Sequence, residues 1–307
     1  MRHRGALCAV PIVAALVGPL SSWAREVAPA ITIAEGGGTV YAAAGGGYRP
    51  AAGVRLSTCD IVRTGPQGLV QVEYPDGGKI ALGPDSRLVF DVPRGGEAAV
   101  GPHFLISGWV KVTVPKRDKA LPYRIDTPQF DLVTDAGVVT LRAGGDEGEF
   151  FVEQGGAAAL VPAPAQGRVA VGSGRSFLRK AGDRGAVSNG VRHPFVEAMP
   201  RAFRDTLPNL LGQMKAANVQ PRPSPEYRPG DAEEWLKSEP ELRSCLSDVT
   251  VRSAQLALQR GGIEVGPIDG ILGPRTAAAL REFQQRNSLA RSGKLDAETL
   301  KALDLAR

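Results

Sequence analysis

Long apolar runs and a strong excess of one charge are missing from this 307-residue sequence, and aromatic residues make up only 6% of it. Beyond the first two dozen residues, no segment approaches the roughly 20 apolar residues of a membrane-spanning helix, which excludes a multi-span membrane protein. Lys and Arg number 37 against 32 Asp and Glu, and this small, evenly spread excess does not indicate a nucleic-acid partner. Hydrophobic residues reach 43%, enough for a folded core.

Motifs of catalysis and of metal or cofactor binding are also missing. The sequence has no Gly-x-Ser-x-Gly, no Gly-Lys-Ser/Thr phosphate loop and no His-Glu-x-x-His. The triplets at 36–38 and 45–47 are glycine-rich but lack the Lys and Ser/Thr that grip a phosphate, so we expect simple loops there. His103 and His193 stand alone and no CxxC occurs. We therefore expect no enzyme, no cofactor and no metal site.

Cysteine is scarce, with three residues in the chain. Cys8 lies in the N-terminal segment, which leaves Cys59 and Cys245 far apart in the sequence. Two cysteines do not make a disulfide scaffold, so the fold must rest on its core. An oxidising compartment would permit a bridge between them, and two unpaired cysteines are the alternative.

The N-terminus has the three parts of a secretory signal peptide. Arg2 and Arg4 precede an apolar stretch over 6–20, and Ser22-Trp23-Ala24 supplies small residues for a cleavage site. The alternative is an uncleaved anchor. Cleavage after residue 24 would remove two arginines, lower the net charge from +5 to about +3, and leave a periplasmic protein without a transmembrane segment.

Glycine and proline are abundant, at 38 and 24 residues, which indicates a turn-rich protein and excludes a long coiled coil. Val70, Val72 and Tyr74 alternate with polar residues, a Pro-Asp-Gly-Gly turn follows, and Ile80 and Leu82 resume the alternation. That pattern predicts a hairpin. About ten short strands over 30–190 predict an all-β domain of sandwich or roll type.

These residues carry a family resemblance. The stretch 56–65 reads LSTCDIVRTG, 68–77 reads GLVQVEYPDG, and Thr127-Pro128 follows. Residues 35–185 thereby resemble the FecR domain, with Cys59 where that family generally has Gly. The resemblance implies the periplasmic part of a membrane-spanning signal relay. Because we expect no transmembrane helix after cleavage, it favours a non-enzymatic binding or scaffolding role here.

Residues 191–245 form a proline-rich connector. Prolines at 200, 208 and 221–225 forbid long helices, and short helical pieces are expected at 201–207 and 210–217. Asp231 with Glu234 three residues later predicts a capping box at the start of a further helix. The connector is either a semi-rigid spacer or a docking element.

The last residues, 246–307, predict three short helices. Val251, Ala254 and Leu258 share one helical face, Gly261-Gly262 ends that helix, Gly273-Pro274 begins the second, and Asp296 caps the third. Residues 248–304 resemble the peptidoglycan-binding domain of cell-wall hydrolases. The motif positions are Gln255, Asp269-Gly270, Gly273-Pro274, Thr276, Phe283-Gln284 and 293–296.

The resemblance implies a shallow peptidoglycan groove at the second helix, with candidate residues Asp269, Gly270, Gly273, Arg275, Thr276 and Leu280. For Asp269 and Thr276 the alternative is a purely structural role in the turn and the helix start. The whole pattern predicts a non-catalytic envelope protein that binds peptidoglycan and presents its β domain to a ligand or to another envelope protein. Alternatives are a wall-remodelling hydrolase with an unrecognised site, or a regulatory partner of one.

Overall fold

The computed structural model describes residues 29–43, 45–93, 98–118, 121–163, 167–214, 219–266, 268, 270 and 272–305. The predicted signal peptide at 1–24 and the candidate site residue Asp269 lie outside these residues. Among the helices of the described part, none is long and apolar enough to cross a membrane.

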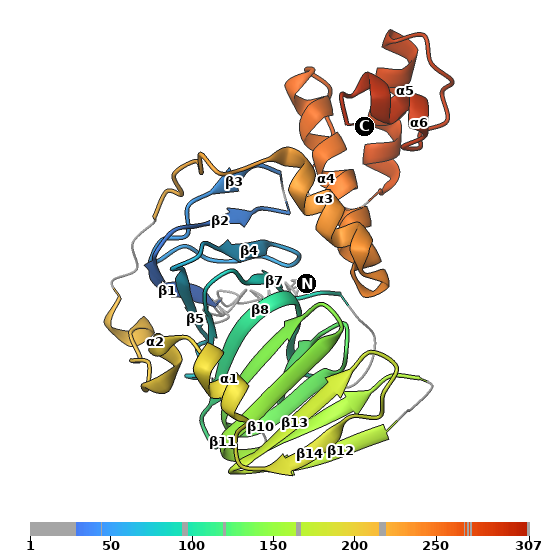
Figure 1. Ribbon diagram of the computed structural model, residues 1–307. Coiled ribbons are helices and arrows are strands. Elements are labelled where there is room, and N and C mark those ends of the chain that lie inside the picture. Colours follow the sequence, from blue (N-terminus) through green and yellow to red (C-terminus); the bar gives the residue numbers. More distant parts are fainter. Residues whose placement is uncertain are drawn as a thin grey trace, which may run out of the picture.

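An all-β region precedes a helical C-terminus, as the sequence predicts (Figure 1). The strands are β1 Ala30–Glu35, β2 Gly38–Tyr41, β3 Gly47–Tyr48, β4 Ile61–Thr64, β5 Leu69–Glu73, β6 Lys79–Leu82, β7 Arg87–Val89, β8 Val100–Val114, β9 Tyr123–Asp126, β10 Asp131–Gly144, β11 Glu147–Val161, β12 Gly167–Gly172, β13 Arg175–Lys180 and β14 Ala186–Asn189. They join in one sheet that branches at β8. The first half of β8 pairs with β7 and its second half with β6 and β10.

Three strands are far longer than predicted. β8, β10 and β11 run for 15, 14 and 15 residues, because glycines that resemble turns in the sequence lie inside them as bends. Gly108 has a φ of +101°, and a Cβ there would lie 2.4 Å from the Cα of Ser86. Gly137 and Gly155 pair with each other where β10 and β11 change register.

The predicted hairpin is confirmed. β5 and β6 pair antiparallel, with Val70 opposite Leu82 and Val72 opposite Ile80. All four side chains are fully buried in the main core of the β region. The period-two pattern therefore identifies the core face, and the residues between them point to the other face of the sheet.

The connector runs along the outside of the β region (Figure 1). It contains α1 His193–Ala198, α2 Arg201–Arg204 and the 3-10 helix η1 Leu211–Gln213. Farther on, the amide of Arg49 donates to the Arg222 carbonyl at 2.9 Å and the amide of Ser224 donates to the Gly47 carbonyl at 3.0 Å. These bonds hold the 222–224 part of the connector on the β region.

The predicted capping box is wrong. Helix α3, Pro229–Ser238, begins two residues before Asp231, and its N-cap Arg228 makes no side-chain capping bond. Proline is well placed at the first helical position, which moves the start upstream. The Asp231 carboxylate instead accepts a hydrogen bond from the Tyr41 hydroxyl at 3.0 Å, so it ties α3 to strand β2.

The C-terminal helices are η2 Pro240–Leu242, α4 Arg243–Arg260, α5 Pro274–Arg286 and α6 Ala297–Ala302. Helix α4 passes through the predicted connector boundary at 245/246 without a break. A disulfide joins Cys245 on α4 to Cys59 beside β4. Both cysteines are fully buried in a second cluster that α3 and α4 share with the β region, whose other members include Tyr41, Ile61, Phe104 and Leu236.

Candidate functional site

Helices α4, α5 and α6 pack around a small apolar core. Its buried members are Ala254, Leu258, Ile263, Val265, Ala279, Leu280 and Leu303. Leu280, a candidate groove residue, has no exposed surface. It faces this core because helical spacing places it on one face of α5 with Thr276 and Gln284, which are also buried. Leu280 therefore stabilises the helices and does not line an open groove.

Gln255 ties the long loop between α4 and α5 to both helices. It is fully buried. Its Oε1 accepts the amide of Gly270 at 3.0 Å, and its Nε2 donates to the Thr276 hydroxyl at 3.0 Å. Gly270 has a φ of +76°, which favours glycine. Thr276 is 3% exposed. Gly270 and Thr276 therefore fix the conformation of the loop through their hydrogen bonds to Gln255.

Gln284 does the same for the loop between α5 and α6. Also fully buried, it accepts the Gly293 amide at 2.9 Å and donates to the Ser292 hydroxyl, the Lys294 carbonyl and the Thr299 hydroxyl at 2.9–3.0 Å. The sequence singles out both glutamines as motif positions. Their place beside core residues on helical faces is the sequence signal that could have identified them as interior.

Asp296 caps α6, as predicted. Its Oδ1 accepts the Thr299 amide at 2.9 Å, and its Oδ2 accepts the Ser292 hydroxyl at 2.7 Å. Hydrogen bonds from the Thr299 hydroxyl, then from Ser292 and the Thr299 amide, lower the pKa of this half-buried carboxylate. The cap fixes where the 288–296 loop meets α6.

An exposed surface remains at the start of α5, which we call the α5 entry surface: Leu272, Gly273 and Arg275. Leu272 is 45% exposed, and of the large hydrophobic side chains in the described residues it shares such exposure with Leu121 alone. Gly273 is the N-cap and Pro274 begins the helix. Arg275 is exposed and lies over Gly266, where a Cβ would be 3.2 Å from the Arg275 Cδ. The sequence prediction includes Gly273 and Arg275 but omits Leu272.

A groove of about 620 Å³ separates these helices from the β region. Leu256, Arg260 and Leu300 line it from the helical side, and Tyr41, Gly46 and Tyr227 from the other. Its lining is mixed apolar and polar. The α5 entry surface does not contribute to it.

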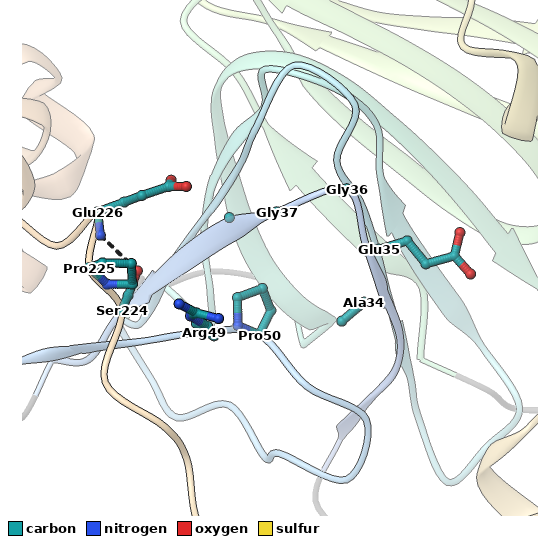
Figure 2. A pocket seen from close by; sticks show the side chains of 10 residues that line it. Ala34, Glu35, Gly36, Gly37, Arg49, Pro50, Ser224, Pro225 and Glu226 are labelled. Atoms are coloured by element: carbon teal, nitrogen blue, oxygen red, sulfur yellow. Dashed lines mark hydrogen bonds between the residues drawn. The ribbon is translucent and has the colours of Figure 1, made fainter.

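A smaller pocket of about 410 Å³ lies at the glycine turn between β1 and β2. Figure 2 shows Arg49 and Pro50 between this turn and the Ser224-Pro225 segment, with the carboxylates of Glu35 and Glu226 on opposite sides. The Glu226 amide donates to the Ser224 hydroxyl at 3.3 Å. One cation between two anions favours no single ligand charge, so this pocket indicates no substrate class.

His103 belongs to a buried polar cluster with Tyr74 and Asp91. It has no exposed surface. The Asp91 amide donates to its Nδ1 at 3.1 Å, so its Nε2 carries the proton and donates to the Tyr74 hydroxyl 2.6 Å away. Burial lowers the pKa of His103 to about 3. Cys59 is in the disulfide with Cys245.

Comparisons with known proteins agree with both resemblances. The family described as "FecR protein" matches residues 60–158, and the family described as "Putative peptidoglycan binding domain" matches residues 247–303. A stretch of 49 residues is 51% identical to "Putative OxPP cycle protein OpcA" of Nostoc punctiforme, and covers 16% of this chain and 10% of that protein. This chain thus spans about a tenth of the length of that curated relative.

Two crystal structures described as "a putative anti-sigma factor" from Parabacteroides distasonis share 15% identity with the chain. Each alignment covers 42% of this chain and 59% of the other, with TM-scores of 0.36 and 0.35. By its family matches, the chain combines a β-rich FecR region with a C-terminal helical domain of the peptidoglycan-binding type.

Proposed function

We propose that this is a non-catalytic envelope protein that binds peptidoglycan through α4–α6 and presents its FecR region to another molecule. The observation that carries the proposal is the family match over 247–303. The buried motif residues Gln255 and Gln284 hold the loops of this domain in one shape. That arrangement leaves the α5 entry surface free to meet a ligand.

The chemistry of the α5 entry surface suits a wall fragment. Leu272 offers an apolar contact that gains free energy when it is covered. The exposed guanidinium of Arg275 is suited to the carboxylates of a stem peptide, which it can hold through two parallel hydrogen bonds. Asp269, adjacent in sequence, stays a candidate contact.

We also propose that the protein works in the periplasm. The disulfide between Cys59 and Cys245 supports an oxidising compartment, where such bonds persist. The basic and then apolar N-terminal sequence is typical of a segment that directs a chain there.

Sedimentation of the full chain with purified sacculi tests the proposal. We expect the wild-type chain to pellet, and the Leu272→Ser, Arg275→Glu double variant to bind at least about tenfold more weakly, since burying a leucine side chain is worth ~1.5–3 kcal/mol. The matched control makes the same substitutions at exposed positions of the β region, Leu121→Ser and Arg168→Glu, and should pellet like the wild type. A wild-type chain that stays in the supernatant while a known wall binder pellets contradicts the proposal.

The same incubation separates a binding protein from a wall hydrolase. Both matched families are of binding or regulatory type, so we expect no soluble muropeptides from sacculi held with the chain. Their release would instead favour the hydrolase. Crosslinking that captures one dominant envelope protein would favour a regulatory role for the FecR region.

A further inference from the structure

The outer face of the sheet carries an unusual set of buried polar side chains. They project from β5, β6, β8 and β11, on the side opposite the main core. We call this set the polar face: Gln71, Glu73, Lys79, Lys111 and Glu153. The first four are at most 5% exposed. Lys111 pairs with Glu153 at 3.1 Å, and Gln71 donates to Glu73 at 2.8 Å.

A segment of the connector covers the polar face, and we call residues 199–211 the strap. The two lysines donate to its carbonyls: Lys79 to Leu207 at 2.6 Å, and Lys111 to Phe203. The side-chain amide of Gln71 donates to the Pro208 carbonyl at 3.0 Å. These contacts follow the strap from one end of the polar face to the other.

Glu73 also binds the strap, but as a hydrogen-bond acceptor and not as a donor. Its two carboxylate oxygens accept the amides of Leu210 and Leu211 at 2.8 and 2.9 Å. All of these bonds from the polar face to the strap reach main-chain atoms, which every peptide possesses. The polar face therefore binds main-chain groups of the strap, some of which lie in α2 and at the start of η1, and depends little on its side chains.

One side chain of the strap supplies the specific contact. Phe203 is fully buried, in a cluster with Trp109 and Ala81 on the outer face of the sheet. Gly83 makes room for it, since a Cβ there would lie 2.9 Å from the Cγ of Pro200 and 3.3 Å from the Phe203 ring. The polar face and this aromatic pocket together form a groove that we call the strap groove.

The strap buries little apolar surface. Over 199–214, every residue of which the structure describes, Phe203 is the one fully buried side chain, and Met199, Ala202 and Leu207 are half-buried against the same cluster. Its helices span four and three residues, too short to be stable by themselves. Apolar contacts would stabilise a permanently bound strap better, because burying charged groups costs free energy. Lysine and glutamate side chains suit a surface that water must sometimes reach.

We propose that the strap groove is a binding site for a peptide segment of a partner protein, with a buried aromatic anchor, and that the strap occupies it in cis until that segment displaces it. The strap can leave locally because the chain is held on both sides of it. Before it, Ser176 in β13 donates to the Gly190 carbonyl at 2.6 Å. After it, Ser224 pairs with Gly47.

Binding of a fluorescein-labelled peptide of residues 199–213 to the full chain tests this proposal. Phe203→Ser should empty the groove, and the variant should bind the peptide at least about tenfold more tightly than the wild type, whose own strap competes. Adding Lys79→Met and Lys111→Met to Phe203→Ser should abolish binding. The matched control adds Lys116→Met, an exposed lysine outside the groove, and should keep it.

Hydrogen exchange on the wild-type chain gives a second readout that does not depend on a variant folding. Saturating peptide should increase deuterium uptake over 199–211 and leave β5 and β6 unchanged. The proposal is overturned if a folded Phe203→Ser chain does not bind, if it binds no better than the wild type, or if uptake over the strap stays constant. Concentration-dependent dimers of Phe203→Ser would assign the groove to a second copy of this chain and would contradict the proposal of a partner protein.

Discussion

His103 shows how one buried side chain couples folding to pH. Its ring is enclosed, neutral, and bonded on both nitrogens to Tyr74 and the Asp91 amide. Its ordinary pKa of 6.5 falls to about 3 in the folded chain. Between these values the unfolded chain takes up a proton that the folded chain refuses, so this residue makes stability fall as the pH drops through that window. Asp91, whose pKa burial raises, acts in the opposite sense.

We predict that His103→Gln reduces the loss of folding stability at acid pH. Glutamine keeps a donor for Tyr74 and an acceptor for the Asp91 amide but has no proton to gain. Between pH 7 and 4.5 the wild type should lose about 2–3 kcal/mol more than the variant, because one proton contributes ~1.4 kcal/mol per pH unit. Urea unfolding at the two pH values measures this. Parallel pH profiles for the two chains would show that His103 is not the cause.

Single residues also mark where the sequence is informative. The cap at Asp296 and the helix start at Pro274 follow from local backbone chemistry, and both were predictable. The sequence motif predicts that Leu280 lines a groove, but its side chain is buried. A motif specifies the order of residues along the chain and not their burial. Cys59 adopts a φ of +65°, a conformation that favours glycine, which is the residue that the resembled family generally has here.

At the scale of elements, local patterns predicted helices and hairpins but not long-range partners. The β5–β6 hairpin has its alternation and its turn within 14 residues. The continuous strands β8, β10 and β11 were missed because glycines that permit a bend look the same in sequence as glycines that end a strand. The strap was equally hidden, since its partners Glu73 and Lys79 lie more than 120 residues away.

We predict that Gln284→Ala loosens the α5–α6 loop. The change leaves the Gly293 amide and the Thr299 hydroxyl without their buried partner. Each buried polar group that loses its hydrogen bond costs about 1–3 kcal/mol of stability. The free energy of opening of α6, measured by native-state hydrogen exchange, should fall by about 2–4 kcal/mol. Gln285→Ala, the exposed neighbour, is the matched control and should change it by less than about 0.5 kcal/mol. Equal effects of the two changes would rule out the assigned role of Gln284.

At the scale of the whole molecule, an apolar cluster, a cation–π contact and a disulfide attach the helical domain to the FecR region. The buried cluster around Tyr41 and Leu236 joins α3 to β2 and β4, and the Arg87 guanidinium lies 5.3 Å from the centre of the Trp235 ring. The Cys59–Cys245 disulfide spans 186 residues of sequence. These contacts set where a wall-bound domain would hold the strap groove.

We predict that this disulfide makes the two parts unfold together. Cross-linking over so long a loop stabilises by up to about 5 kcal/mol in the chain-entropy model. Calorimetry of the oxidised chain should show one transition, and the Cys59→Ser, Cys245→Ser variant should show a lower first transition for α3–α6. The Cys59→Gly, Cys245→Ala variant also lacks the bond but suits the left-handed turn, so it should regain about 1–2 kcal/mol in the β transition. A single transition at an unchanged temperature in both variants would mean that the apolar interface alone couples the two parts.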